Sequence, residues 1–412
     1  MSTSDTEVAI VGGGAAGIAA ARCLAEAGVE CLIIEARDRL GGRGWTVETD
    51  GFALDLGCGW LHSADRNPWS KIAQRQGRAI DKTPPPWARP SLEAGFPIGE
   101  QRAYIAAMNA FFERVGAAAQ QDDDVAAAEL LEAGGRWNGL IGTVGTFISG
   151  GELDQVSVRD FDNYADTDVN WRIVEGYGAT IVAHAPAIRT ALGCAVQRID
   201  RSGARLRVET THGTITADRV IVTLPSALIA EHEDLFAPAL PEKTEAAAGL
   251  PLGLADKLFI SLAQADEFPP DSRLFGRPDT GATAAYHLRP FGRPMIECYF
   301  GGRLAAGLER GGPAAFFDFA VSELTGVLGA EFAKRLKAGP MHPWGGDPFA
   351  RGSYSYARPG KVACRAALAA AVEQRIFFAG EACSAHDFST AHGAYLTGVA
   401  AAQQAITARA AA

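Results

Sequence analysis

VAIVGGGAAGIAAARCLAEAGVECLIIE, the stretch from Val8 to Glu35, decides the fold of this chain. The apolar run Val8–Val11 is typical of a buried strand, and the glycines after it indicate a turn. Ala15–Ala27 has the alanine-rich composition of a helix that stops at Gly28, and Glu30–Glu35 is a second apolar strand. This order predicts one βαβ half of a parallel α/β sheet.

The glycine turn has the spacing of a dinucleotide-binding loop. The pattern G-x-G-x-x-G permits a tight turn, close approach of the backbone to a pyrophosphate, and close packing of helix on strand. Glu35, at the end of the second strand, is placed to accept hydrogen bonds from a ribose. The alternative is a glycine-rich structural turn. The residues predicted to face the pyrophosphate are Gly12, Gly14, Ala15, Ala16 and Gly17.

A second glycine turn follows the second strand and favours FAD over NAD as the dinucleotide. Gly41 and Gly42 are adjacent, and Arg37 and Arg43 flank them. Such a turn offers N–H groups and cations within reach of the same pyrophosphate, for which NAD proteins have little need. We expect Ala36, Arg37, Gly42 and Arg43 to belong to the cofactor site.

Composition excludes several classes of protein. The 412 residues include 38 basic and 48 acidic side chains, a net charge of -10, which speaks against a nucleic-acid binder and mildly favours cationic small molecules. The seven cysteines show no CxxC pair and no metal-ligand spacing, so we expect neither a disulfide framework nor a metal. The polar start MSTSDTE lacks the basic region of a secretory signal, and the longest apolar stretch is too short for a membrane span. A soluble, cytoplasmic protein is expected.

The remaining patterns predict strands and helices after a proline-rich break at Pro84–Pro86. Helical patterning covers 100–133, with a solvated turn at Asp122–Asp124. The other predicted helices are Pro313–Leu328 and 391–408, and the predicted strands are Ala195–Ile199, Arg205–Thr210, Arg219–Thr223, Lys257–Leu262, Met295–Phe300 and Ile376–Ala379.

The stretch from Val8 to Arg43, which ends in GGR, resembles the amino-terminal signature of FAD-dependent amine oxidases, the family of monoamine and polyamine oxidases. Two further blocks support this resemblance: DLGCGWLH at Asp55–His62, followed by Asn67-Pro68, and FFAGE at Phe377–Glu381, followed by HGAYLTG at 392–398. The stretch DRVIVTLP at 218–225 resembles the segment that packs on adenine. The resemblance places Gly57, Cys58, Gly59, Trp60, Val196, Trp344, Gly380, Glu381 and Ala394 beside FAD.

The resemblance also implies a catalytic set. Lys257 matches the family's lysine that holds a water against flavin N5, and the alternative is a lysine that protects a strand edge. Tyr354 and Tyr395 resemble the aromatic pair that stands perpendicular to the flavin, with Tyr356 as a competitor of Tyr354 through a one-residue slip. Ser353 stands where covalent members carry the flavin-linking cysteine, so FAD is expected to be non-covalent. His62 is expected near the mouth of the site, or else in a structural role.

The reaction implied is amine oxidation: hydride moves from the substrate to FAD N5, an imine leaves and hydrolyses, and oxygen reoxidises the flavin to give hydrogen peroxide. His62 and the acidic balance favour a polyamine or an aliphatic or aryl-alkyl amine. An L-amino acid oxidase needs an arginine clamp and stays open as an alternative. So do a desaturase-like or protoporphyrinogen oxidase-like enzyme and a non-catalytic flavoprotein. A homodimer also stays open.

The predicted fold class is α/β: a Rossmann-like FAD-binding domain of the glutathione-reductase type, interleaved with an α+β substrate-binding domain. We expect the FAD-binding domain to comprise residues 1–75, 176–252 and 346–412, and the substrate-binding domain 76–175 and 253–345.

Overall fold

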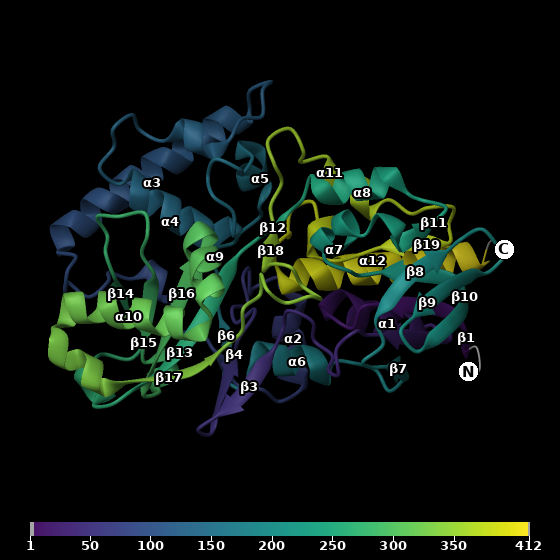
Figure 1. Ribbon diagram of the computed structural model, residues 1–412, viewed down its shortest axis with the longest axis horizontal. Coiled ribbons are helices and arrows are strands. Elements are labelled where there is room, and N and C mark those ends of the chain that lie inside the picture. Colours follow the sequence, from purple (N-terminus) through teal and green to yellow (C-terminus); the bar gives the residue numbers. More distant parts are fainter. Residues whose placement is uncertain (1–3, 411–412) are drawn as a thin grey trace.

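The computed structural model of the chain describes residues 4–410, so the first three residues of the polar start lie outside it. Figure 1 shows two regions side by side. One, at the right of the view, combines purple, teal and yellow segments from both ends and the middle of the chain. The other is built from blue and green segments. Among the described helices, none has both the length and the apolar character that crossing a bilayer requires.

Within residues 4–410, the first region holds an eight-stranded sheet in the order β11-β8-β9-β10-β1-β2-β7, with β19 also paired to β10. Pairing is parallel from β19 through β10, β1 and β2 to β7, and antiparallel from β8 through β9 to β10. The strands are β1 (Ser4–Val11), β2 (Cys31–Ile34), β7 (Arg189–Ala191), β8 (Val196–Asp200), β9 (Leu206–Thr210), β10 (Gly213–Val222), β11 (Phe236–Ala237) and β19 (Ile376–Phe378).

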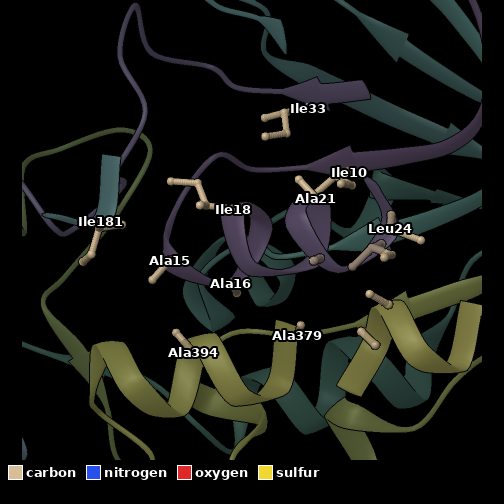
Figure 2. Close-up of a cluster of buried hydrophobic side chains, with 14 of the residues drawn as sticks. Ile10, Ala15, Ala16, Ile18, Ala21, Leu24, Ile33, Ile181, Ala379 and Ala394 are labelled. Atoms are coloured by element: carbon tan, nitrogen blue, oxygen red, sulfur yellow. The ribbon is translucent and has the colours of Figure 1, made fainter. Parts of the chain in front are cut away.

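Helix α1 (Ala15–Glu26) lies between this sheet and the terminal helix α12 (Ala391–Ala410). Figure 2 shows its apolar side chains between Ile10 and Ile33 of the sheet and Ala394 of α12. The two helices meet through small residues: a Cβ on Gly398 would lie 2.2 Å from the carbonyl oxygen of Ala16. Close packing of this kind fixes the amino end of α1, which faces the cavity described below.

Within the described chain, the second region is built on a five-stranded sheet, in the order β14-β15-β16-β13-β17. One face packs apolar residues such as Leu258 and Phe300 against α9 and α10, and the other face meets the cavity. The strands are β13 (Ala255–Leu262), β14 (Ser272–Phe275), β15 (Ala285–Leu288), β16 (Met295–Gly301) and β17 (Leu336–Met341), and the two helices are α9 (Gly302–Gly311) and α10 (Pro313–Leu328).

Further helices enclose the cavity and both sheets. Helices α3 (Ile98–Ala119), α4 (Asn138–Ser149) and α5 (Val158–Asn163) form the blue layer of Figure 1 and share one apolar cluster. The others are α2 (Pro68–Arg75), α6 (Tyr177–Ala183), α7 (Ser226–Glu231), α8 (Pro241–Ala248) and α11 (Cys364–Ala369). Short strand pairs are β3 (Thr46–Thr49) with β4 (Phe52–Asp55), β5 (Ile80–Asp81) with β6 (Arg172–Ile173), and β12 (Leu252–Gly253) with β18 (Tyr354–Ser355).

The structure confirms the α/β fold class and most of the predicted elements, including α10 with the predicted bounds. The helical prediction over 100–133 was too long. Helix α3 ends at Ala119, and the acidic turn at Asp122–Asp124 separates it from a 3-10 turn at Ala127–Leu130. The strands of the eight-stranded sheet fall within the segments expected for the FAD-binding domain, while the boundaries between domains stay a prediction.

Candidate functional site

A cavity of about 1100 Å³ lies where the two regions meet. Its wall includes the residues that follow the carboxyl ends of β1, β2, β10 and β19, together with cavity-facing residues of β13, β14, β15 and β16. Ligands of open α/β sheets bind at the carboxyl ends of the strands. The cavity therefore combines the expected nucleotide site with a chamber in the second region.

The first glycine turn forms a cradle that any side chain would fill. Gly12 has φ +105°, and a Cβ there would lie 2.5 Å from Thr223 Oγ1. Gly17 does not line the cavity in the described structure. It packs beneath the turn, where a Cβ would lie 1.9 Å from the carbonyl oxygen of Gly12. Gly14, the N-cap of α1, has no side-chain hydrogen bond within the described residues, so the N–H groups that open α1 can bind an anion.

Glu35 holds the two glycine turns in place. Its Oε2 accepts a hydrogen bond of 2.7 Å from the Gly13 N–H, and its Oε1 accepts one of 2.9 Å from the Arg37 N–H. The second turn touches the first, since the Gly41 N–H donates to the carbonyl of Gly13 at 2.8 Å. A carboxylate bound in this way fixes the shape of the phosphate cradle.

Two ion pairs, each between a partly buried arginine and a buried carboxylate, join distant segments at the cavity wall. Arg37 pairs with Asp347 at 2.6 Å, and Arg43 pairs with Glu381 at 3.0 Å. Glu381 also accepts a hydrogen bond from Ser355 Oγ at 2.6 Å. Burial alone would raise the pKa of the Glu381 carboxyl, but Arg43 and the hydrogen bond from Ser355 hold it below its usual range. Glu381 is therefore a fixed anion in the cavity wall.

The other residues expected to contact the cofactor also line this cavity. They are Ala15, Ala16, Ala36, Gly42, Gly57, Cys58, Gly59, Trp60, Val196, Trp344, Gly380 and Ala394. The buried Trp344 is fixed by a hydrogen bond of 3.0 Å from its Nε1 to the carbonyl of Leu56. A Cβ on Gly57 would lie 1.7 Å from the carbonyl oxygen of Arg43. The glycine cradle and the open helix end fit a dinucleotide such as FAD.

Lys257 reaches the cavity from β13, on the face opposite the apolar core. Its Nζ lies 3.0 Å from Glu297 Oε1 and donates to the carbonyl of Asp55 at 3.3 Å. Gly59 leaves room for the ammonium, because a Cβ there would lie 3.0 Å from Nζ. Burial alone would lower the pKa of Lys257, but nearby Glu297 and other groups raise it above its ordinary value. Lys257 is therefore a fixed cation rather than a strand-edge lysine.

A row of charged side chains continues from Lys257 across the five-stranded sheet, and sequence reasoning missed it. His287 lies opposite Glu297, with 3.7 Å between Nδ1 and Oε2, and its Nε2 lies 3.0 Å from Asp271. Although burial opposes ionisation, Lys257 and His287 hold the pKa of Glu297 well below its usual range. A charged residue at an alternate position of the apolar strand Met295–Gly301 was the signal available for Glu297.

Tyr354 meets a second tyrosine that the sequence did not single out. The Tyr354 hydroxyl donates to the carbonyl of Phe147 at 2.6 Å and lies 3.1 Å from the hydroxyl of Tyr299. Tyr299 lies directly opposite Lys257 in the sheet. Tyr356 also lines the cavity, and its hydroxyl donates to Gln155 at 2.7 Å. Tyr299, which lies beside Lys257, and Tyr354 are thus two tyrosines in contact in the cavity wall.

The expectation that Tyr395 completes this pair was wrong. Tyr395 packs its ring 5.1 Å from Trp69 and 5.9 Å from His184, and it is not part of the cavity wall in the described structure. Successive residues of a helix point about 100° apart, so the preceding Ala394 faces the cavity while Tyr395 faces the core. The HGAYLTG motif at 392–398 does reach the cavity through Ala394, but the rotation of α12 about its axis points Tyr395 away from the cavity.

Substitution of Tyr354 and of Tyr395 by phenylalanine is expected to have different effects on catalysis. Tyr354→Phe should lower kcat/KM for amine by about tenfold, because it removes a buried hydrogen bond and leaves Tyr299 without its partner. Tyr395→Phe should change kcat/KM by less than about twofold, since the hydroxyl of Tyr395 makes no hydrogen bond among the described residues. Steady-state kinetics of both variants decides this, and equal losses would contradict the assignment.

His62 lies in the cavity wall beside two tryptophans and an amide. Its Nδ1 is 2.6 Å from Asn170 Oδ1, and because an amide oxygen only accepts, Nδ1 carries the proton. Burial lowers the pKa of His62, which favours the neutral imidazole, and Nε2 has no hydrogen-bond partner among residues 4–410, so it can accept. Trp60 and Trp87 meet edge to face at 4.5 Å beside it, and Trp87 is 45% exposed. This group of residues marks the mouth of the cavity.

Comparison with known proteins gives one consistent answer. The model of the family described as flavin containing amine oxidoreductase matches residues 15–78 and 104–406. Polyamine oxidase 4 of Oryza sativa subsp. japonica is 29% identical, over 97% of this chain and 88% of its own length. Lysine-specific histone demethylase 2 of Homo sapiens is 26% identical, over 95% of this chain and 52% of its own length.

Solved structures agree on the fold. A variant of putrescine oxidase superposes with a TM-score of 0.79 over 98% of this chain and 100% of the other, at 18% sequence identity. The match by family model covers most of the chain, including helix α1 from Ala15 onward, Lys257 and Tyr354. This chain therefore belongs to the flavin-containing amine oxidoreductase family and is an FAD-dependent, amine-oxidising enzyme.

Proposed function

We propose that the enzyme oxidises the C–N bond of an aliphatic amine to an imine, which water then hydrolyses to a carbonyl compound and either ammonia, from a primary amine, or a smaller amine, from a secondary one. Bound FAD would accept the hydride from the carbon next to nitrogen and pass the electrons to oxygen, which yields hydrogen peroxide. One observation carries this proposal: the cavity that begins at the glycine cradle continues to Lys257, Tyr299 and Tyr354.

Lys257 supplies a positive charge that does not need to be assembled during the reaction. Glu297 and the carbonyl of Asp55 hold the ammonium in one position. A preorganised cation in a site that excludes water stabilises negative charge that develops nearby, without reorganisation. In the proposed reaction Lys257 remains protonated and orients a water molecule between itself and the cofactor.

The tyrosines hold the amine and keep water out. Tyr354 is fixed at its hydroxyl by Phe147, and Tyr299 is fixed by Tyr354, so their rings cannot swing away. The electron-rich faces of such rings attract a cationic amine before it loses its proton. The same rings present an apolar wall to the neutral amine.

The mouth of the cavity favours a cationic substrate. Asp166 and Asp168 are exposed there, and neither forms an ion pair with another described residue. Exposed carboxylates raise the local concentration of cations and their rate of arrival. His62, with Nε2 free, can accept a hydrogen bond from the amine. Primary and secondary aliphatic amines, polyamines among them, are the substrates that we propose.

An L-amino acid is a weaker candidate. It needs an unpaired guanidinium close to the reacting carbon, whereas Arg37 and Arg43 on the cofactor side are both bound to carboxylates. Beside Lys257 lie Glu297, whose carboxylate would repel a second carboxylate, and Tyr299, whose hydroxyl is already in contact with that of Tyr354.

The experiment that tests the proposal is anaerobic mixing of the FAD-loaded enzyme with amines, followed through the visible flavin band. Alkylamines, spermidine, putrescine, aromatic monoamines and L-amino acids are each mixed with it in turn. Rapid bleaching by an aliphatic amine supports the proposal. Bleaching by L-amino acids alone, or by no compound at all, would overturn it.

The pH dependence of kcat/KM is expected to be bell-shaped. The amine must be neutral when hydride leaves, which favours high pH, whereas the acidic mouth and the tyrosines favour its cation. The pKa of Lys257 is raised and that of Glu297 is lowered, so both groups stay charged. Neither group is therefore expected to cause the acidic or the basic limb of the pH profile. Profiles for two amines of different pKa provide the check: a limb should move with the substrate, and a flat profile would contradict the expectation.

A further inference from the structure

The cavity holds an arginine for which the proposed reaction has no use. Arg273 lies on β14 opposite His287, and both line the cavity. His287 lies opposite Glu297 of β16. Tyr299, two residues further along β16, lies opposite Lys257 of β13. Adjacent strands lie about 4.8 Å apart, so the backbones of Arg273 and Lys257 are roughly 14 Å or more apart on the same face of the sheet.

Most cations of the cavity wall have a carboxylate partner, but Arg273 and Arg89 do not. Arg37, Arg43 and Lys257 each lie within 3.0 Å of one. Among residues 4–410, no carboxylate lies within ion-pair distance of the guanidinium of Arg273 or Arg89. Arg273 rests on the ring of Phe275, with 4.1 Å from Cζ to the ring centre.

Arg89 is also incompletely bound. Its terminal nitrogen donates to the backbone carbonyl of Asp271, and its buried Nε has no hydrogen-bond partner in the described structure.

The charge of Arg273 is likewise poorly compensated. Burial lowers the pKa of Arg273 to about 10, with only Tyr104 acting in the opposite direction. Two partly buried guanidinium groups without counter-charge are costly unless a ligand brings an anion to them.

The surroundings of Arg273 indicate the shape of that ligand. Phe96, Tyr104 and Phe275 form an aromatic cluster with centroid distances of 5.5 to 6.2 Å, and Ile105 and Met108 of α3 line the cavity beside it. Gln101 in the same wall is already bound to backbone groups of Ser91 and Phe96. Apolar side chains gathered around an unpaired cation suit the end of an alkyl chain that carries an anion.

We infer that Arg273, assisted by Arg89, forms a subsite for a carboxylate at the far end of the substrate. This inference rests on the proposed function and makes it more specific: the preferred amine carries a carboxylate remote from the carbon that is oxidised. A planar carboxylate matches the paired N–H groups of a guanidinium. The separation from Lys257 excludes the α-carboxylate of an amino acid, which lies one bond from the reacting carbon.

Matched compounds test the subsite. At each chain length from four to twelve carbons, an alkylamine, the corresponding ω-aminoalkanoate and the α,ω-diamine differ only in the far terminus. For the wild-type enzyme, kcat/KM should be about tenfold higher for the ω-aminoalkanoate than for the alkylamine at the longer lengths. Equal values for the three compounds at every length would overturn the inference.

Two variants of Arg273 and one control assign the effect to this residue. Arg273→Gln should abolish the preference for the carboxylate, and Arg273→Glu should reverse it in favour of the diamine. Arg102→Gln, which removes an exposed arginine of α3 outside the cavity wall, should retain the wild-type preference. FAD absorbance and melting temperature verify that each variant is folded. A preference that persists in Arg273→Gln would contradict the subsite.

Binding of octanoate separates this inference from the proposed function. Octanoate has no amine to oxidise, so its effect on the flavin spectrum and its calorimetric Kd report the subsite alone. Arg273→Gln should weaken this binding by about tenfold. If octanoate binds in this way while no amine bleaches the flavin, the subsite stands and the proposed function fails. If alkylamines bleach the flavin and octanoate binds both proteins equally, the function stands and the subsite fails.

Discussion

Lys257→Met is expected to bind FAD like the wild-type enzyme but to lose about two orders of magnitude in the rate at which amine reduces the flavin. The residues of the glycine cradle lie on other elements and do not depend on this side chain. The variant removes the buried cation that Glu297 and Asp55 hold in the cavity wall. Stopped-flow reduction under anaerobic conditions, at several amine concentrations, separates the rate of reduction from amine binding.

The same substitution leaves Glu297 without its main counter-charge, so a loss of stability must be distinguished from a loss of function. Removing one partner of a buried ion pair costs about 3–5 kcal/mol, whereas removing both can be nearly neutral. The double variant Lys257→Met/Glu297→Gln should therefore recover melting temperature but not the rate of reduction. A double variant that recovers both would show that Lys257 acts on structure alone.

Lys243 offers a matched control. It is the other buried lysine in the described chain, and its Nζ donates to the backbone carbonyls of Ala367, Leu368 and Ala370 at the end of α11, away from the cavity wall. Lys243→Met should lower the melting temperature and leave the reduction rate of the folded enzyme within about twofold of wild type. If Lys243→Met slowed reduction as much as Lys257→Met, the assignment to Lys257 would be wrong.

The nucleotide half of the site could be predicted because its determinants are local. Within Val8–Glu35 the strand, the glycine turn, the helix and the acid follow one another, and each has a strong backbone preference. The structure adds one correction of role: Gly17 serves the packing of α1 on Gly12 and does not line the cavity among the described residues. Close packing of helix on strand was one of the three reasons for glycine at such a position.

The substrate half could not be predicted to the same extent, because pairing between strands decides it. Arg273, His287, Glu297 and Tyr299 lie on three strands, and only their register brings them to the face that carries Lys257. A slip of one residue would move each to the opposite face, and alternation within a strand does not state which face meets the cavity.

Ion pairs pose the same difficulty. Arg37 finds its carboxylate 310 residues away in Asp347, and Arg43 finds its own in Glu381. The sequence shows many arginines of equal appearance, and the distinguishing property, the absence of a partner within the described chain, exists only after folding. An amino acid oxidase needs an unpaired arginine, so this alternative could be judged only from the structure, which shows which arginines have carboxylate partners.

The second large effect is expected for Glu35→Gln, which should weaken FAD binding by about a hundredfold. Both oxygens of Glu35 accept backbone N–H groups, one from Gly13 in the first turn and one from Arg37 beyond the second strand. An amide supplies only one accepting oxygen and places its NH₂ against an N–H donor. Since Glu35 as a residue is only 4% exposed, water cannot replace the lost bond.

Titration of the apoprotein with FAD, followed by flavin fluorescence, gives the dissociation constant directly. Glu30→Gln is the matched control, because Glu30 precedes the same strand but pairs with Arg189 at the surface. It should leave FAD affinity unchanged. The difference in melting temperature with and without FAD should shrink in Glu35→Gln and not in Glu30→Gln, since a ligand stabilises the folded state according to its affinity. Equal FAD affinity in Glu35→Gln and wild type would show that the glycine cradle keeps its shape without this carboxylate.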